Sequence, residues 1–316
     1  MKNDYEVVII GGSLAGAACV RELVRLGIDA IALERDRFPR RKVCGGFLSP
    51  GAVESLEQLE LLEEVLNAGA VKVSSARVRA GATEVEIAFD RPALGISRNV
   101  LDDILARGAR VQQGVPVRSV KRCNAGFDVD GFRCSVVIDA SGKLGRFTKR
   151  QRVDEFGIQY SEAQSRGSVL DFSFFEDGYG GGVSVEGGRS NWCFLIKKAA
   201  LPKYLDRPDC LVTGPLAYDR LPGEFIAIGD AAGMVDPFCG EGMRQAIESG
   251  VLAAGVVAAG IGRGATYEEM KDRYESEWIR RWGLRRAVGA GLRRLQEYFG
   301  VGLRLAPARV LKRIWD

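Results

Sequence analysis

A glycine-rich segment near the start of the chain has residue types and a spacing that suit a bound pyrophosphate. Residues 11–16 read GGSLAG, follow a short apolar run at residues 7–10, and precede a helical pattern. At a helix start, backbone N–H groups and the helix dipole attract negative charge, and large side chains would obstruct the ligand. We therefore predict that Gly11 permits a tight turn and Gly16 permits close packing of helix on strand, with Ser13 replacing the usual middle glycine.

An acidic residue stands where a dinucleotide-binding fold needs one. A second strand pattern, at residues 29–33, ends in Glu34. Strand, turn, helix, strand and terminal acid together predict a βαβ unit at residues 5–34. Glu34 is expected to hold the ribose hydroxyls of an adenosine, and its charge would repel a 2′-phosphate. The unit therefore favours FAD or NAD over NADP, and it leaves the choice between FAD and NAD open.

The composition excludes several kinds of chemistry. The 316 residues are 46% hydrophobic, enough for a packed core, and include no histidine. Histidine triads and histidine metal sites are therefore excluded, and any proton must move through another group. The seven cysteines form no C-x-x-C pair, so we predict neither a metal site nor a disulfide framework. Reduced cysteines, with no room for a signal peptide before the first strand, predict a cytoplasmic location.

Positive charge is concentrated at the C-terminal end. Residues 279–316 hold ten basic and two acidic side chains. The whole chain has 45 basic and 41 acidic residues, so residues 1–278 hold 35 basic and 39 acidic ones. We predict a basic helical region at residues 263–316, whose part from residue 278 rests on an anionic membrane at its inner face, with Trp278 and Trp282 among the apolar contacts. The alternative is a set of helices docked on the body with a solvated basic face. No base-reading motif accompanies the charge, so nucleic acid is not a predicted partner.

Residues 151–215 differ in pattern from the rest of the chain. Short alternating segments, such as residues 156–160 and 191–196, are separated by glycine turns, which is typical of antiparallel strands. We predict three parts: a dinucleotide-binding domain from residues 1–150 and 216–262, an antiparallel sheet at residues 151–215, and the C-terminal region. The sequence predicts no oligomeric state.

Two further motifs accompany the glycine motif. Residues 39–46, PRRKVCGG, form a basic loop after the second strand, and residues 229–243, GDAAGMVDPFCGEGM, follow a strand pattern. Together with Arg98 and the DASG sequence at residues 139–142, they resemble the geranylgeranyl reductase family within the para-hydroxybenzoate hydroxylase-type flavoprotein superfamily. The resemblance implies an α/β fold with a Rossmann-like FAD-binding domain of the GR2/PHBH type, a small antiparallel substrate sheet and a helical C-terminal tail.

The resemblance also implies a cofactor and its contacts. The cofactor is FAD, reduced by NAD(P)H or another external reductant, because the sequence holds no second nucleotide-binding unit. Asp230 would bind the ribityl chain or the pyrophosphate, and residues 240–243 would present backbone N–H groups to the flavin edge that becomes negative on reduction. The implied cofactor-binding residues are Gly11, Ser13, Leu14, Ala15, Gly16, Glu34, Arg35, Lys42, Cys44, Gly45, Arg98, Asp230, Pro237, Gly240, Glu241, Gly242 and Met243.

The reaction implied by the resemblance is hydride transfer between flavin N5 and an apolar, isoprenoid or polyketide-like substrate, as in reduction of a C=C bond. Tyr179 and Cys44 are the predicted catalytic residues, as proton donors, and water is the remaining source. Of the reductases' Tyr-x-Trp-x-Phe-Pro motif, this sequence retains only the tyrosine, Tyr179. The glycines at residues 180–182 replace the motif's aromatic residues and predict a wider cavity. The alternatives are a monooxygenase that hydroxylates a lipid-like aromatic compound and a non-catalytic FAD-binding protein. The halogenase motif Trp-x-Trp-x-Ile-Pro has no match.

Overall fold

The computed structural model describes residues 3–124, 126–143, 147, 151–207, 209–218 and 223–294. The predicted βαβ unit is present: β1 (Asp4–Ile10) leads into α1 (Leu14–Arg25), and the chain returns along β2 (Ala30–Glu34) parallel to β1. Its residues suit these elements because the apolar run of β1 is buried and small side chains line α1 where it meets the sheet. The end of β1 and the start of α1 thus meet at one edge of the sheet.

The first sheet has seven strands around β1. Its order is β6-β2-β1-β9-β8-β7, with β15 beside β9. The pairs that flank β1, and the β9–β15 pair, are parallel, whereas β7, β8 and β9 form an antiparallel meander. The further strands are β6 (Val111–Gln113), β7 (Val120–Cys123), β8 (Gly126–Val129), β9 (Phe132–Asp139) and β15 (Ile226–Ala227). The carboxyl ends of β1, β9 and β15 therefore share one edge, where α/β sheets bind ligands.

The second sheet has eight strands and draws on two separate stretches of the chain. Its order is β14-β10-β13-β12-β11-β4-β5-β3, and β4 and β11 are its parallel pair. The strands are β3 (Phe47–Leu48), β4 (Val71–Ala80), β5 (Thr83–Gly95), β10 (Glu155–Glu162), β11 (Val169–Phe175), β12 (Gly178–Val185), β13 (Arg189–Lys197) and β14 (Leu211–Thr213). The sequence-based division into parts therefore needs a correction, because residues 47–95, assigned to the first domain, supply three of these strands.

Helix α5 (Gly242–Gly262) is central and buried. By length and composition it is the one helix, within the described ranges, that could cross a membrane, yet it packs against α1, α2 and α6. A Cβ on Gly250 would lie 2.4 Å from the Ala15 carbonyl oxygen, so the two helices cross in close contact there. The other α-helices are α2 (Pro50–Gln58), α3 (Leu62–Asn67), α4 (Arg98–Ala106) and α6 (Tyr267–Arg294). Short 3₁₀ helices are η1 (Glu186–Gly188), η2 (Lys198–Tyr204), η3 (Gly229–Ala232) and η4 (Pro237–Cys239).

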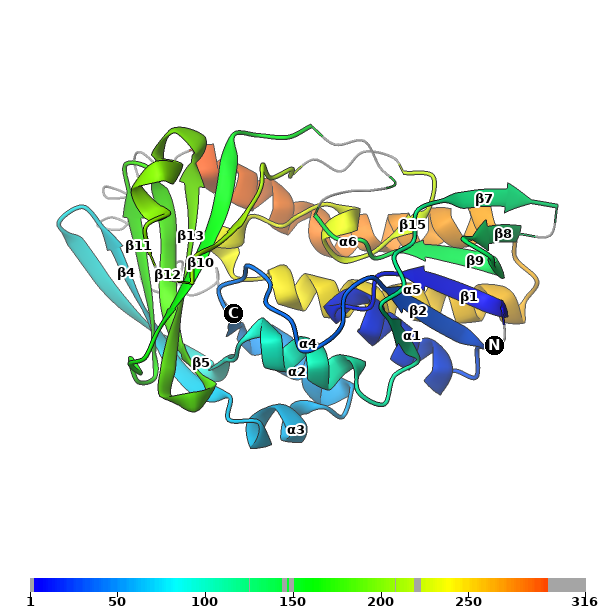
Figure 1. Ribbon diagram of the computed structural model, residues 1–316, viewed down its shortest axis with the longest axis horizontal. Helices are drawn as coiled ribbons and strands as arrows, with labels where there is room; N and C mark the ends of the chain where they lie inside the picture. The colour runs from blue at the N-terminus through cyan, green and yellow to red at the C-terminus, as the bar shows by residue number, and fades with distance from the viewer. Residues whose placement is uncertain are drawn as a thin grey trace.

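Helix α6 runs along the molecule from the first sheet toward the second (Figure 1). Trp278 and Trp282 are each 1% exposed and belong to the main core, together with Tyr274. The expectation that these two tryptophans contact a membrane is therefore wrong, because the helix turns them inward. Residues 295–316 of the predicted membrane-facing region lie outside the described residues.

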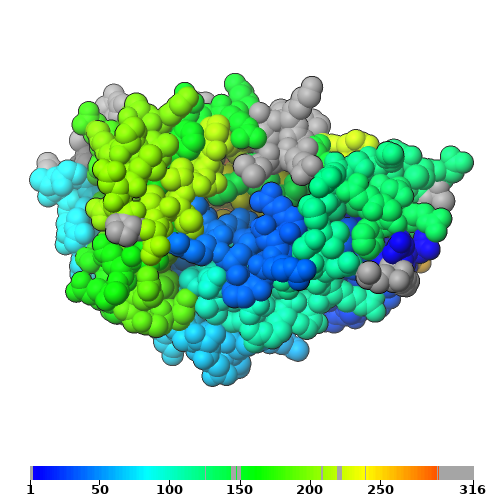
Figure 2. Space-filling view, viewed as in Figure 1, coloured from blue at the N-terminus to red at the C-terminus, as the bar shows by residue number. Residues whose placement is uncertain are grey.

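The loop after β2 lies between the two sheets. Figure 2 shows this segment in blue at the surface, between the strands of the second sheet and the teal and green elements of the first. Its residues 42–45 contribute to the wall of a cavity that both sheets share. The predicted fold class is confirmed: an α/β dinucleotide-binding domain, a second sheet and C-terminal helix are all present.

Candidate cofactor and substrate site

The glycine motif forms a turn in which backbone atoms come unusually close. A Cβ on Gly16 would lie 1.8 Å from the Gly11 carbonyl oxygen, and a Cβ on Gly11 would lie 2.5 Å from the Ala140 carbonyl oxygen. Gly11 also has a φ of +104°, which side chains rarely adopt. Ser13 ends the turn as the N-cap residue of α1. The close backbone packing therefore leaves no room for a side chain at Gly11 or Gly16, as a tight turn for a pyrophosphate requires.

Glu34 is the last residue of β2, lies beside Gly12 of this turn, and is 4% exposed. Its Oε2 accepts a hydrogen bond from the Gly12 N–H at 2.8 Å, and its Oε1 accepts one from the Asp36 N–H at 3.0 Å. A carboxylate has about four lone-pair positions, so it retains acceptor capacity for ribose hydroxyls. The two backbone contacts fix the orientation of the carboxylate before any ligand binds.

Two cavities adjoin one another along the edge of the first sheet. One, of about 340 Å³, is lined by Gly11, Glu34 and Arg35, and the other, of about 240 Å³, by Cys44, Arg98 and Asp230. Both are bordered by Ser13, Lys42, Val43, Ala140, Gly142, Lys143 and Thr213. A long, bipartite ligand such as FAD fits this arrangement, with a polar end at Glu34 and the opposite end in the second cavity.

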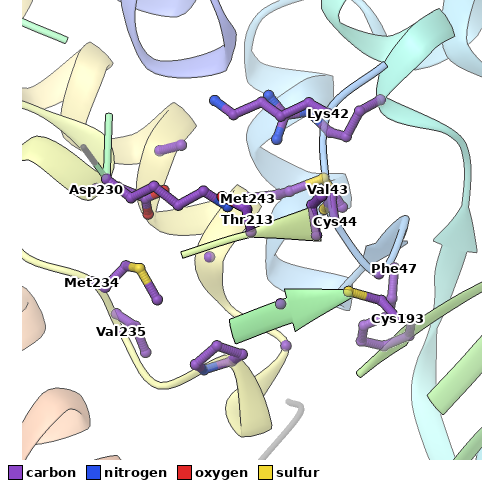
Figure 3. A pocket seen from close by; sticks show the side chains of 18 of the residues that line it. Lys42, Val43, Cys44, Phe47, Cys193, Thr213, Asp230, Met234, Val235 and Met243 are labelled. Atoms are coloured by element: carbon purple, nitrogen blue, oxygen red, sulfur yellow. The ribbon is translucent and has the colours of Figure 1, made fainter. Parts of the chain in front are cut away.

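The second cavity collects most of the predicted site residues. Figure 3 shows side chains from the loop after β2, the second sheet and the segment after β15 around it. Of the predicted residues, those that line it are Ser13, Leu14, Ala15, Lys42, Cys44, Gly45, Arg98, Tyr179, Asp230, Pro237, Gly240, Gly242 and Met243. Gly16 and Glu241 line neither cavity: the first packs inside the glycine turn, and the second is buried beside α6.

The segment containing Cys44 is held by two side chains of the second sheet. Gln159 accepts a hydrogen bond from the Cys44 N–H at 3.0 Å, and Asn191 donates to the Cys44 and Gly45 carbonyls at 2.9 and 2.6 Å. Gln159 also donates to Asn191 at 2.5 Å. Both amides are buried and face the same side of the sheet as Cys193, which lines the cavity. The position of Cys44 is thus set by residues more than 100 positions away in the chain.

Arg98 belongs to a buried charge cluster. Its guanidinium donates to both carboxylate oxygens of Asp102 at 2.7 and 3.0 Å and to the Ser13 hydroxyl at 2.6 Å. Asp102 is fully buried and Arg98 is 9% exposed. Burial by itself would lower the pKa of Arg98, but Asp102 raises it above its ordinary value. The cluster joins α4 to the start of α1, and Arg98 stays charged within the cavity wall.

Two lysines border both cavities. Burial and the nearby Arg98 lower the pKa of Lys42 to about 8. Asp102 and Asp230 act in the opposite direction. Burial also lowers the pKa of Lys143, and Asp230 opposes that shift. Sequence reasoning missed Lys143, because one lysine after DASG carries no periodic or motif signal. Both lysines stand at the junction of the two cavities, where a dinucleotide that occupied both would carry its negative charge.

We expect the affinity of the apoprotein for FAD to fall as pH rises from about 7 to about 10, because Lys42 must be protonated to hold a pyrophosphate. Without ligand, Lys42 loses its proton near pH 8. A bound anion raises its pKa, so binding above that pH takes up a proton. Titrations of flavin fluorescence across this range, with calorimetry in two buffers, measure both effects. Lys42→Met should flatten the profile, whereas a wild-type affinity independent of pH would contradict this role.

The wall of the second cavity against the second sheet is aromatic. Phe172 of β11, Tyr179 of β12 and Phe238 of η4 line it, and Phe174 of β11 packs against all three, with ring centroids 5.3 to 6.2 Å apart. The glycines at residues 180–182 differ in what they leave room for. A Cβ on Gly180 or Gly182 would strike the ring of Phe194 or Trp192, and these two rings stack at an interplanar angle of 3°. Gly181 pairs with Cys193 and lines the cavity without a side chain, as a wider cavity requires.

Tyr179 is 3% exposed, and its hydroxyl donates to Asp236 Oδ1 at 2.5 Å. Burial and the neighbouring Asp236 carboxylate raise the pKa of Tyr179 well above its ordinary value. Asp236 also accepts a hydrogen bond from the Phe238 N–H at 3.0 Å. The tyrosine proton therefore faces the carboxylate, and the pair joins the second sheet to the segment that precedes α5.

A family model described as "FAD binding domain" matches residues 4–143 of the chain. The menaquinone reductase of Mycolicibacterium smegmatis is 25% identical over 82% of this chain and 78% of that protein. The digeranylgeranylglycerophospholipid reductase of Methanoculleus marisnigri is 26% identical over 88% of this chain and 82% of that protein. Among solved structures, the flavin-dependent brominase Bmp2 superposes with a TM-score of 0.79 at 19% identity, covering 99% of this chain and 94% of that chain. The likeness to the brominase shows the shared fold.

Proposed function

We propose that this chain is an FAD-dependent oxidoreductase of the para-hydroxybenzoate hydroxylase-type superfamily, related to the geranylgeranyl reductases, and that it reduces a C=C bond of an apolar, isoprenoid-like substrate. The observation that carries the proposal is the aromatic cavity that adjoins the dinucleotide groove. Besides Tyr179 and the phenylalanines, its lining includes Leu170, Leu195, Leu216, Met234 and Val235. An apolar chain buried there would gain about 25 cal/mol for each Å² removed from water.

FAD held in these cavities would supply the hydride, so the chain has to supply a proton to the second carbon. Tyr179 directs its proton to Asp236 rather than into the cavity. Cys44 lines the same cavity, and its side chain interacts with the Arg98 guanidinium. We therefore assign the proton to Cys44 and give Tyr179 a positioning role. The reductant, NAD(P)H or a separate protein, docks transiently, because the described residues contain one dinucleotide-binding βαβ unit.

An anaerobic single-turnover experiment tests the reaction class. The protein is loaded with FAD, reduced with dithionite, and mixed with menaquinone or a digeranylgeranyl lipid, the compounds named for its relatives. Reoxidation of the flavin without oxygen, with two hydrogens added across a C=C bond of the isoprenoid chain, is the expected result, whereas a product reduced only at the quinone ring would contradict C=C reduction. If the flavin stays reduced until oxygen enters and the product then gains an oxygen atom, the protein is instead a monooxygenase. Cys44→Ser should slow reoxidation by about 100-fold, within the range for a lost general acid, and leave FAD binding intact.

We further propose that the exposed side of α6 contacts an anionic membrane, where such substrates reside. Ile279, Leu284 and Val288 are 51%, 75% and 50% exposed, within a region rich in arginine. Leu284→Glu should weaken co-sedimentation with anionic vesicles, because it removes an apolar contact and adds repulsion. Leu205→Glu, at an exposed leucine away from α6, is the matched control. Equal losses in both variants, or no vesicle binding by the wild type, would refute the proposal.

A further inference from the structure

Two adjacent arginines of α6 reach the segment that precedes α5. We define residues 233–241 as the flavin-edge loop, since they lead from η3 to the start of α5 at the second cavity. Arg286 donates to the Met234 carbonyl at 3.4 Å, near one end of the loop, and to the Tyr218 carbonyl. Arg285 pairs with the Glu241 carboxylate at 2.5 Å, at the other end. The two contacts thus span the loop.

The charge of the buried Glu241 carboxylate is balanced by two arginines, Arg285 and Arg244. The residue is 2% exposed, and its Oε2 is shared by Arg285 and, at 3.2 Å, by Arg244. Burial raises the pKa of Glu241, and both arginines act in the opposite direction. A buried carboxylate that loses a cation is left at a high free energy. Movement of the loop away from Arg285 is therefore unfavourable.

A second buried carboxylate, seven residues or about two helical turns further along, repeats the arrangement. Glu248 of α5 pairs with Arg244 and with Arg281 of α6, both at 2.7 Å. The guanidinium groups of Arg285 and Arg286 also lie 5.6 and 5.4 Å from the ring centroids of Trp282 and Trp278, which are buried in the core. The arginines therefore project from an anchored part of the helix, and the Arg285 side chain is itself 43% exposed.

We propose that α6 is part of the cofactor site, and that Arg285 and Arg286 are positioning residues for the flavin-edge loop. By holding both ends of the loop, they keep the N–H groups at the start of α5 directed at the flavin edge that becomes negative on reduction. Through this contact the C-terminal helix sets the preference of the site for reduced over oxidised flavin. The inference rests on the position of FAD and does not depend on the substrate.

The test compares Arg285→Gln with Arg280→Gln, which removes the same charge from an exposed position on the same helix. The midpoint potential of bound FAD is measured with reference dyes. Arg285→Gln should reduce the ratio of affinities for reduced and oxidised flavin about tenfold, a fall of about 30 mV for a two-electron couple. Hydrogen exchange of residues 234–243 in the apoprotein should become faster in this variant and not in Arg280→Gln. Equal potentials and equal exchange in the two variants would overturn the proposal.

A double variant separates positioning from a long-range charge effect. In a Glu241→Gln background, Arg285→Gln should produce no further change in potential, because the carboxylate through which it acts is absent. If the two single shifts add instead, Arg285 acts directly on the flavin and the positioning role is wrong. Neither the potential nor the exchange measurement requires a substrate, so both remain informative if the proposed C=C reduction fails.

Discussion

Gly16→Ala is expected to abolish stoichiometric FAD binding. The added Cβ would lie 1.8 Å from the Gly11 carbonyl oxygen, so either α1 or the turn must move. Either movement displaces the N–H groups that receive the pyrophosphate. We expect the FAD dissociation constant to rise by at least about 100-fold, which is about 2.8 kcal/mol. Flavin absorbance of the purified protein and a fluorescence titration of the apoprotein measure the effect.

The matched control is Gly255→Ala. Gly255 also lies inside a helix, but a Cβ there would meet nothing within 4 Å. That variant should bind FAD normally and gain up to about 1 kcal/mol of stability, the difference in helix propensity between alanine and glycine. Normal FAD affinity in folded Gly16→Ala would show that the pyrophosphate does not lie at this turn.

Arg98→Met is expected to destabilise the apoprotein by about 3 kcal/mol, because it leaves the fully buried Asp102 carboxylate without its main cation. The nearby Arg40, with Nη1 at 3.4 Å, and the Ser13 hydroxyl compensate only in part. The variant should also bind FAD more weakly, since Arg98 lines the second cavity. Urea unfolding of the apoprotein gives the stability without a contribution from bound cofactor.

A second arginine–aspartate pair at α4 serves as the control for Arg98→Met. Arg107 and Asp103 form a second pair four residues apart at 2.6 Å, but Arg107 is 64% exposed. Arg107→Met should cost no more than about 1 kcal/mol, as exposed pairs do. Combining Arg98→Met with Asp102→Leu should recover part of the lost stability, because no unpaired carboxylate then remains. Equal costs for the two single variants would mean that burial of the charge is not what makes the Arg98 pair important.

The sequence predicted those parts of the site whose residues are close together in the chain. The glycine turn, Glu34 and the βαβ unit are one continuous stretch with helix and strand periodicity, so local patterns suffice to place them. Gln159 and Asn191 were missed because they meet Cys44 only after two sheets have formed around the loop. Polar residues in alternating strands ordinarily face solvent, and no local signal marks the two that face a cavity.

The C-terminal helix shows that the charge pattern along the sequence does not predict which charged residues pair in the fold. The sequence indicates a basic helix, and the structure has one as far as residue 294. Charge counting along the chain could not show that Glu241 and Glu248 lie opposite Arg285 and Arg281, since Glu241 immediately precedes α5 and Glu248 belongs to it. It also could not show that Trp278 and Trp282 face inward. Membrane-facing and core-facing aromatic residues have the same spacing on an amphipathic helix.

The parallel pairing of β4 with β11 has a consequence for how the chain folds during synthesis. Residues 75–80 pair with residues 169–174, so nearly one hundred residues must leave the ribosome before β4 gains its second neighbour. Until then the β4–β5 hairpin has an open edge, the kind of surface that pairs with other chains. Non-local pairing of this type also slows folding, because a long loop must close before the contact forms. A chain that stalls or is cut between residues 95 and 169 therefore presents an aggregation-prone edge.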